Sequence, residues 1–259
     1  MSTLEKLKDH WETLAERDAL HAILTDSRKR VGRWQIAEFM ATGVYEIETV
    51  LSYLAELGCL PEFSGTALDF GCGVGRLTQA LARRFNSTVG VDISHRMIRT
   101  AESFNRFAHC RYLVSASALL PFADASFSFI YSNILQHVPR RIATRYLREF
   151  IRVLEPGGVL VFGVQDCFAA PDVPSLFTRI RHILNLRSRF RVALGLGTEE
   201  MQIHCLPERI VRRNLNPARV VDIQFTNTAA KDFNGRLVYL HQPPASGYVA
   251  KQYCAVKIG

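Results

Sequence analysis

Hydrophobic patterning divides the chain near residue 60. Over residues 1–57, apolar side chains recur every three or four positions in two runs, residues 4–24 and 36–54. This period is typical of amphipathic helices. Gly58 follows the second run and supplies a stop signal for its helix. We therefore expect residues 1–60 to form a helical extension that covers a substrate pocket as a lid.

After residue 60, short apolar stretches alternate with helical periods. Strands are expected over residues 66–70, 88–93, 111–114, 127–132 and 159–164, and helices over residues 77–85, 95–104 and 143–154. Strands separated by helices of this length indicate an α/β domain with a parallel, doubly wound sheet.

The tail of the chain predicts two more strands, residues 220–225 and 247–256. No convincing helical period lies between them, which favours an antiparallel pair at the sheet edge. The main domain is therefore expected to span residues 61–259, with a helical insertion at about residues 166–215.

The formal net charge of +8 allows an acidic partner, such as nucleic acid, an anionic membrane surface or an anionic substrate. Much of the excess is local, because residues 173–198 contain five arginines and no acidic residue. Within them, residues 174–195 have the pattern of a basic amphipathic helix, which can lie on a membrane surface or receive an amphiphilic substrate. We favour a lid helix, and such a local element argues against nucleic acid as the partner.

Other features of the composition are ordinary. No apolar stretch approaches the roughly 20 residues of a membrane helix, and the N-terminus lacks the apolar core of a secretory signal. A cytoplasmic protein is the expectation. The six cysteines are scattered singly without metal-ligand spacing, so we expect reduced thiols and no metal site.

Candidate chemistry begins at three glycines, Gly71, Gly73 and Gly75, between an expected strand and an expected helix. Glycine permits a tight turn there and close approach of a ligand to the backbone. Asp92 closes the next strand, where a carboxylate can accept hydrogen bonds from both hydroxyls of a ribose. These features fit a nicotinamide dinucleotide as well as other nucleoside cofactors.

The spacing and one acidic residue separate these cofactors. In the dinucleotide fingerprint the third glycine would fall at Arg76. Asp69 stands just before Gly71, where its negative charge would oppose a pyrophosphate but would favour an ammonium group. The cofactor implied has a ribose, an amino-acid head and no phosphate.

The segment A-L-D-F-G-C-G-V-G-R-L-T, residues 67–78, resembles motif I of the class I S-adenosylmethionine-dependent methyltransferases. Three more stretches resemble the same family in order and spacing: V-D-I-S through Met97, L-P-F-A-D-A-S-F at residues 120–127, and V-L-E-P-G-G at residues 153–158. The resemblance implies S-adenosylmethionine as the cofactor. It also implies a Rossmann-like, doubly wound, seven-stranded sheet whose last strand is antiparallel.

The resemblance also implies roles by position. The expected cofactor contacts are Gly71, Gly73 and Gly75 to the methionine and ribose, Asp92 to the ribose diol, Ile93 and Met97 to the adenine, and Asn133 to the methionine. Asp69 would face the ammonium group. Met97 can equally be a core residue, and Asn133 can be a turn residue.

The chain departs from the family in the adenine loop. Ser115-Ala116-Ser117 replaces the usual pair of an acidic and a small residue. Because Ala116 has no side-chain acceptor, Ser117 or a backbone carbonyl must receive the adenine amine.

Methyl transfer to a hydroxyl benefits from a base, and a histidine suits this task near neutral pH. His137 follows the fourth expected strand and His204 follows the basic insertion, although either can simply bond a backbone carbonyl. We expect transfer of a methyl group to a small organic acceptor, with oxygen as the favoured acceptor atom. The acceptor pocket is expected to be built by residues 1–57 and 165–215. The acceptor can be amphiphilic or anionic, and peripheral membrane contact is compatible with it.

Three other functions stay open at this stage. The first is an RNA methyltransferase that uses the basic insertion, although no separate RNA-binding module is visible. The second is a non-catalytic protein that binds S-adenosylmethionine as a ligand. A nicotinamide enzyme ranks last.

Overall fold

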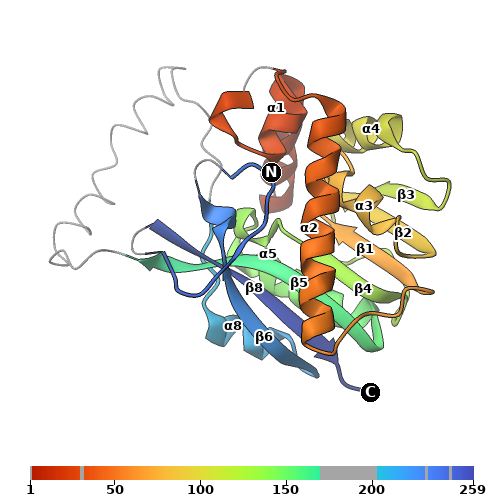
Figure 1. The fold of residues 1–259 in the computed structure, drawn as a ribbon, viewed down its shortest axis with the longest axis vertical. Coiled ribbons are helices and arrows are strands. Elements are labelled where there is room, and N and C mark those ends of the chain that lie inside the picture. Colours follow the sequence, from red (N-terminus) through yellow and green to blue (C-terminus); the bar gives the residue numbers. More distant parts are fainter. Residues whose placement is uncertain (1, 30–31, 170–202, 231–232, 245–246) are drawn as a thin grey trace, which may run out of the picture.

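The computed structural model describes residues 2–29, 32–169, 203–230, 233–244 and 247–259. They form one sheet with helices on both faces (Figure 1). The helices are α1 (Thr3–Ile23), α2 (Ile36–Glu56), α3 (Arg76–Leu81), α4 (His95–Phe104), α5 (Arg140–Val153) and α8 (Glu208–Asn214), with short 3-10 turns η1 (Ser27–Lys29), η2 (Leu135–His137) and η3 (Asn227–Ala229). The strands are β1 (Thr66–Phe70), β2 (Ser87–Asp92), β3 (Cys110–Val114), β4 (Phe127–Ser132), β5 (Leu154–Ala169), β6 (Ala218–Thr226), β7 (Tyr239–Leu240) and β8 (Gly247–Lys257).

The strand order in this sheet is β3-β2-β1-β4-β5-β8-β6-β7. The strands from β3 to β5 are parallel, and β8 runs antiparallel to both β5 and β6. The Rossmann-like α/β class and the antiparallel edge pair are therefore confirmed. The described residues form eight strands instead of seven, because the two-residue β7 pairs with the outer edge of β6.

Alternation along the strands sends side chains to two separate cores. On one face, Leu68, Ile130 and Leu160 pack with α5 and α8. On the other face, Ala67 and Phe129 pack with α2 and α3. Helix α2, the second helix of the N-terminal extension, therefore packs directly on the sheet as part of the main domain.

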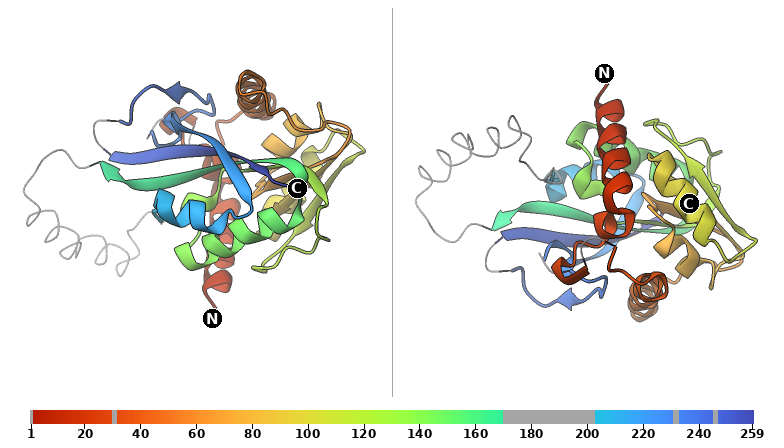
Figure 2. Two further views of the ribbon diagram at one scale, coloured as in Figure 1. Left: turned by 90° about the horizontal axis from the view of Figure 1, so that it is seen from below. Right: turned by 90° about the horizontal axis from the view of Figure 1, so that it is seen from above.

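Helix α1 lies beside α4 (Figure 2). Glu12 fixes this contact, because its carboxylate accepts the free backbone N–H groups of His95 at 2.7 Å and Arg96 at 3.2 Å. A carboxylate at the start of a helix also interacts favourably with the helix dipole. The capping contact therefore anchors α1 to the main domain near the end of β2.

Element boundaries differ most from the sequence expectation in α3 and β5. Helix α3 ends at Leu81, four residues before the expected end, and turn structure follows it. Residues 156–158 lie within β5 as an irregularity of the pairing with β4, where Gly157 has a φ of +77°. The expected turn before the fifth strand is therefore a bulge inside that strand.

Much of the expected helical insertion, including the basic amphipathic segment at residues 174–195, lies outside the described residues. Its flanks are the end of β5 and helix α8. None of the helices in the described ranges is both long and apolar enough to cross a membrane.

Candidate active site

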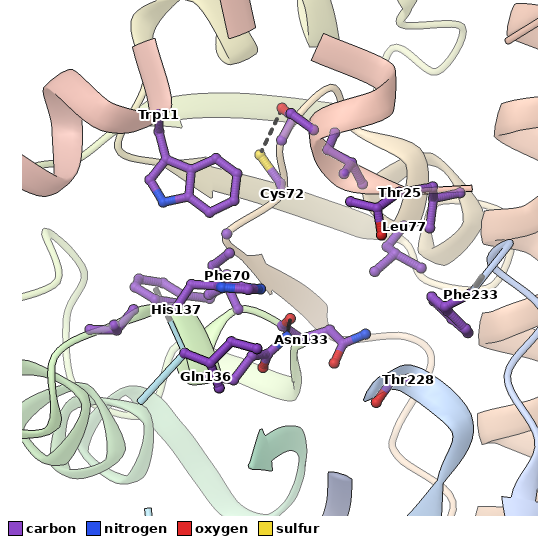
Figure 3. A pocket seen from close by; sticks show the side chains of 18 of the residues that line it. Trp11, Thr25, Phe70, Cys72, Leu77, Asn133, Gln136, His137, Thr228 and Phe233 are labelled. Carbon is purple, nitrogen blue, oxygen red and sulfur yellow. Dashed lines mark hydrogen bonds between the residues drawn. The ribbon is translucent and has the colours of Figure 1, made fainter. Parts of the chain in front are cut away.

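A cavity of about 1050 Å³ lies at the carboxyl edge of the sheet. Its lining includes Asp92 at the end of β2, Gly71 after β1, Asn133 after β4, Gln165 on β5 and Thr226 on β6. The strand order places these five residues in that sequence along the edge. Helix α1 contributes Trp11, and the segment after β6 contributes Thr228 and Phe233 (Figure 3). A ligand site at this edge is the general expectation for a doubly wound sheet.

The glycine loop begins the cavity. Gly71 and Gly73 have φ values of +79° and +52°, a region that favours glycine. The Gly71 N–H donates to the Val91 carbonyl at 2.8 Å, and the Gly73 N–H donates to Asp92 Oδ2 at 2.8 Å. The loop is therefore tied to the end of β2 by its own backbone.

Asp92 holds two backbone amides at once, because Asp92 Oδ1 accepts the Ser94 N–H at 2.9 Å. Ser94 rather than Asp92 caps α4, since its hydroxyl accepts the Met97 N–H at 3.2 Å. Burial raises the pKa of Asp92 above its ordinary value. Each carboxylate oxygen keeps acceptor capacity beyond its single amide, and Asp92 lines the cavity.

Asp69 lies beneath the loop and is absent from the cavity lining. Its side chain is buried and accepts a hydrogen bond from the Thr78 hydroxyl at 2.6 Å. Burial raises the pKa of Asp69 to about 7. Its expected contact with an ammonium group therefore stays a prediction.

The other expected cofactor residues divide into two groups. Ile93 and Met97 line the cavity, and Met97 is also part of a buried apolar cluster with Trp11. Gly75 does not line it; its φ is +80°, and a Cβ there would lie 2.4 Å from the Tyr112 hydroxyl. Ser117 does not line it either.

The adenine loop is held by its own hydrogen bonds. The Ser117 hydroxyl accepts the Leu119 N–H at 3.1 Å, and the Ser117 carbonyl accepts the Tyr146 hydroxyl at 3.0 Å. Ser115, two residues earlier, lines the cavity instead. Within the adenine loop, the structure thus brings Ser115 rather than Ser117 to the site.

Asn133 stands at the middle of the cavity, and a buried polar network supports it from behind. Its amide nitrogen lies 3.5 Å from Glu46 Oε1, which also accepts the Tyr131 hydroxyl at 2.7 Å. Glu46 Oε2 pairs with Arg76 at 2.7 Å, and both side chains are almost completely buried. This ion pair joins α2 to the start of α3, just after the glycine loop.

The two candidate bases differ in position. His137 lines the cavity, and its ring meets Trp11 edge to face with centroids 5.8 Å apart (Figure 3). His204 is not part of the lining; its backbone N–H donates to the Gln136 carbonyl at 2.7 Å. Burial lowers the pKa of His204, so its ring is neutral near pH 7.

The sequence did not single out several lining residues. Trp11 is one of the apolar positions in the run of residues 4–24, and Gln165 closes an apolar run in the same way that Asp92 does. A polar residue at the carboxyl end of the fifth strand was therefore a signal that could have been used. Thr228 and Phe233 lie in a segment without a regular period, which offered no such signal.

The charge of the lining tests which cofactor fits. Among the described lining residues, Arg76 is the one lysine or arginine, and Glu46 already neutralises it. A diphosphate would lack a cationic partner there, whereas Asp92 offers acceptors to ribose hydroxyls. The residues present therefore fit a nucleoside that carries no phosphate. The described residues contain no group of three or more metal-ligating side chains.

Comparisons with known proteins point to one family. Residues 67–158 match the family described as "Methyltransferase domain". The chain is 36% identical over 100 residues to a demethylmenaquinone methyltransferase of Staphylococcus saprophyticus, which covers 37% of this chain and 42% of that protein. It is 37% identical over 113 residues to a malonyl-[acyl-carrier protein] O-methyltransferase of Erwinia pyrifoliae, covering 44% of this chain and 42% of that protein. The chain thus spans less than half the length of these curated relatives.

Among solved structures, the fold is similar to magnesium protoporphyrin IX methyltransferase from Synechocystis PCC 6803 with bound SAH. The TM-score is 0.59 at 17% identity, and the match covers 98% of this chain and 99% of that chain. At this identity the likeness concerns the fold.

Proposed function

Because this chain belongs to the class I S-adenosylmethionine-dependent methyltransferases, we propose that it transfers a methyl group from S-adenosylmethionine to an oxygen atom of a small organic acceptor. The observation that carries this proposal is the single cavity that joins the glycine loop and Asp92 to His137 and Gln165. Such a cavity can hold a cofactor and an acceptor side by side.

The volume of the cavity is large for a small-molecule site. Such sites are commonly about 300–1,000 Å³, and this cavity has about 1050 Å³. Along the carboxyl edge of the sheet, β2 and β4 are separated by two strand spacings, or about 10 Å. We assign the part of the cavity between them to the cofactor, with Asp92 at the ribose, Ile93 and Met97 at the adenine, and Asn133 at the methionine.

When bound, the cofactor would supply a methyl group on a sulfonium sulfur; the carbon–oxygen bond to the acceptor would form as the carbon–sulfur bond breaks, with the neutral thioether S-adenosylhomocysteine as the leaving group. The chain must align the acceptor and exclude water. Helix α1 supports the exclusion of water, because Leu7, Trp11 and Ile23 line the cavity from the N-terminal side. We therefore propose that residues 1–60 act as a lid over the pocket as well as a layer of the sheet.

We assign the base to His137 in preference to His204. His137 lines the cavity on η2, next to Gln136, and Trp11 constrains the orientation of its ring. A neutral imidazole there can accept the hydroxyl proton of the acceptor as the carbon–oxygen bond forms. His204 contributes its backbone to the same region, but its side chain is not part of the lining.

The proposal also names oxygen as the atom of the acceptor that receives the methyl group. Similar proteins include an O-methyltransferase from Erwinia pyrifoliae and a 24-methylenesterol C-methyltransferase from Oryza sativa, so both kinds of acceptor atom occur among them. A histidine in the cavity favours oxygen here, because a hydroxyl must lose its proton during transfer.

Two measurements test the proposal. Calorimetry should detect binding of S-adenosylhomocysteine, the demethylated product, and no comparable binding of NAD. Incubation with S-adenosylmethionine labelled on the methyl group should then move the label onto hydroxyl compounds from a chemically diverse set. Tight binding of the product without transfer to any acceptor would leave a non-catalytic cofactor-binding protein.

A further inference from the structure

The part of the cavity beyond Asn133 has a defined floor. Gln165 on β5 pairs with Ala250 on β8, and Phe225 on β6 pairs with Lys251. The next position of the same register sets Thr226 on β6 opposite Ala250. Gln165 and Thr226 therefore lie on neighbouring strands on either side of Ala250. Directly paired strand residues point to the same face of a sheet. Ala250 between them is buried and carries no polar side-chain group.

The side chain of Gln165 is the unusual group on this floor. It is only 4% exposed, and its Oε1 has no hydrogen-bond partner among the described residues. Leaving a buried amide oxygen without a partner costs roughly 1–3 kcal/mol. Because Gln165 lines the cavity, a ligand in the cavity can supply the missing donor.

The surroundings of Gln165 are apolar or neutral. The apolar lining residues on this side include Ile203, close to the bridge between Cys205 and Gln165, and Leu240, which pairs with Phe225. Thr228 adds a hydroxyl whose oxygen lies 2.9 Å from the Thr226 hydroxyl. In the described lining, the carboxylate of Asp92 and the guanidinium of Arg76 are the side chains charged near pH 7, apart from histidine, and both belong to the glycine-loop end.

Along the sheet edge that the cavity follows, β4 and β6 are separated by three strand spacings, or about 14 Å. This part of the cavity is therefore longer than a single small polar group. Among the described lining residues on this side, an ionised acceptor would find no side chain of opposite charge to offset the hydration that it loses. An apolar ring system would instead bury surface against the aliphatic side chains there.

We propose that this half of the cavity binds the methyl acceptor as an uncharged, ring-bearing hydroxy compound, and that the Gln165 amide selects it by accepting a hydrogen bond. Gln165 is then a specificity-determining residue. The inference rests on the proposed function, since it concerns the acceptor of that same site, and it narrows the acceptor class to neutral compounds.

Three matched probes test the inference: 2-naphthol, which is neutral, 2-naphthoate, which is anionic, and naphthalene, which has no hydrogen-bonding group. Their dissociation constants are measured by equilibrium dialysis against the complete chain saturated with S-adenosylhomocysteine. We expect 2-naphthol to bind at least about tenfold more tightly than 2-naphthoate, a difference of about 1.4 kcal/mol. Tighter binding of 2-naphthoate, or no binding of 2-naphthol, overturns the inference.

Gln165→Leu removes the amide at nearly constant volume. It should weaken 2-naphthol binding by about fivefold, within the range of one neutral hydrogen bond, while naphthalene binding and S-adenosylhomocysteine binding stay unchanged. Gln224→Leu is the control, because Gln224 lies on β6 away from the lining and bonds Tyr53 at 3.0 Å. Equal effects of the two variants on 2-naphthol, or no effect of Gln165→Leu, contradict the role of Gln165.

Gln165→Met provides a second variant if Gln165→Leu does not fold, because it also lacks the amide oxygen, and the same loss confined to 2-naphthol is expected. The two levels of the argument remain separable. Failure of S-adenosylhomocysteine to bind the unmodified chain would refute the proposed function itself. Normal S-adenosylhomocysteine binding with the wrong probe order refutes only the acceptor class.

Discussion

The side chain of Asn133 occupies the space above Gly163, so that a Cβ on Gly163 would lie 2.5 Å from Asn133 Oδ1. Gly163 lies on β5, and Asn133 directly follows the neighbouring strand β4. A glycine at this point of the strand therefore lets the amide of Asn133 rest on the sheet at the centre of the cavity. Gly163 has no left-handed φ, so the requirement concerns space alone.

Gly163→Ala should displace Asn133 and weaken S-adenosylhomocysteine binding by about tenfold, or about 1.4 kcal/mol. The fold should be retained, because alanine is compatible with an extended backbone. Calorimetry of Gly163→Ala, Asn133→Ala and the double variant forms a thermodynamic cycle. If the glycine acts through Asn133, the double variant is no weaker than Asn133→Ala; fully additive losses would argue against this coupling.

Asp92→Ala should weaken S-adenosylhomocysteine binding by roughly tenfold or more, because it removes acceptors that face the cavity and releases the Gly73 N–H. Circular dichroism should show an intact fold. Ser94→Ala is the matched control at the same strand end. It removes the cap of α4 and should cost about 1 kcal/mol of stability with little effect on affinity. Unchanged affinity in Asp92→Ala would remove this residue from the cofactor site.

His137→Ala should lower turnover by about a hundredfold or more while S-adenosylhomocysteine affinity changes little, because the role proposed for the imidazole is proton transfer. The measurement compares kcat with the binding constant, using an acceptor found in the screen for transfer. His204→Ala serves as the comparison and should retain most of the activity. Equal turnover of His137→Ala and the unmodified chain would assign His137 to structure.

Glu46→Gln should destabilise the fold by about 3 kcal/mol, because it leaves the Arg76 guanidinium buried without its counter-charge. Denaturant unfolding measures the loss. The double variant Glu46→Gln with Arg76→Met should recover part of it, since no uncompensated charge remains. A double variant that is less stable than Glu46→Gln alone would show that the ion pair is not the source of the loss.

Asp69 predicts a pH dependence of stability. Burial raises its pKa from 3.8 to about 7 in the folded chain, so the folded state holds a proton that the unfolded state loses. The stability is fully present below about pH 4 and is lost as the pH rises to about 7, by roughly 4 kcal/mol at most.

Asp69→Asn should abolish this part of the dependence, because the amide does not titrate. Urea unfolding at pH 5 and at pH 8 gives the change in the free energy of unfolding for the unmodified chain and for Asp69→Asn. The difference between the two changes is the contribution of Asp69. We expect the unmodified chain to lose more stability than Asp69→Asn between these values. Parallel losses would place the pKa of Asp69 outside this window.

The sequence by itself determined the local elements and their class. Periods of two and of three to four residues predicted β1, β4 and α4 with their observed bounds, because burial on one face is written into the spacing of apolar residues. Gly71, Gly73 and Asp92, singled out from the sequence, line the cavity at the end that we assign to the cofactor, since a tight turn and a strand-end carboxylate are local requirements. The buried Asp69 shows the limit of this reasoning, because its identity did not reveal that Thr78 would be its partner.

The sequence indicated that residues 1–57 and 165–215 build the acceptor pocket, but only the tertiary structure identified the individual residues of the proposed acceptor end. Gln165, Thr228 and Trp11 come from β5, the segment after β6 and α1, and only the strand order and the docking of α1 bring them to one cavity. Glu46 likewise meets Arg76 because α2 packs on α3. Contacts between distant segments depend on the whole fold, so no pattern within a short stretch of the chain encodes them.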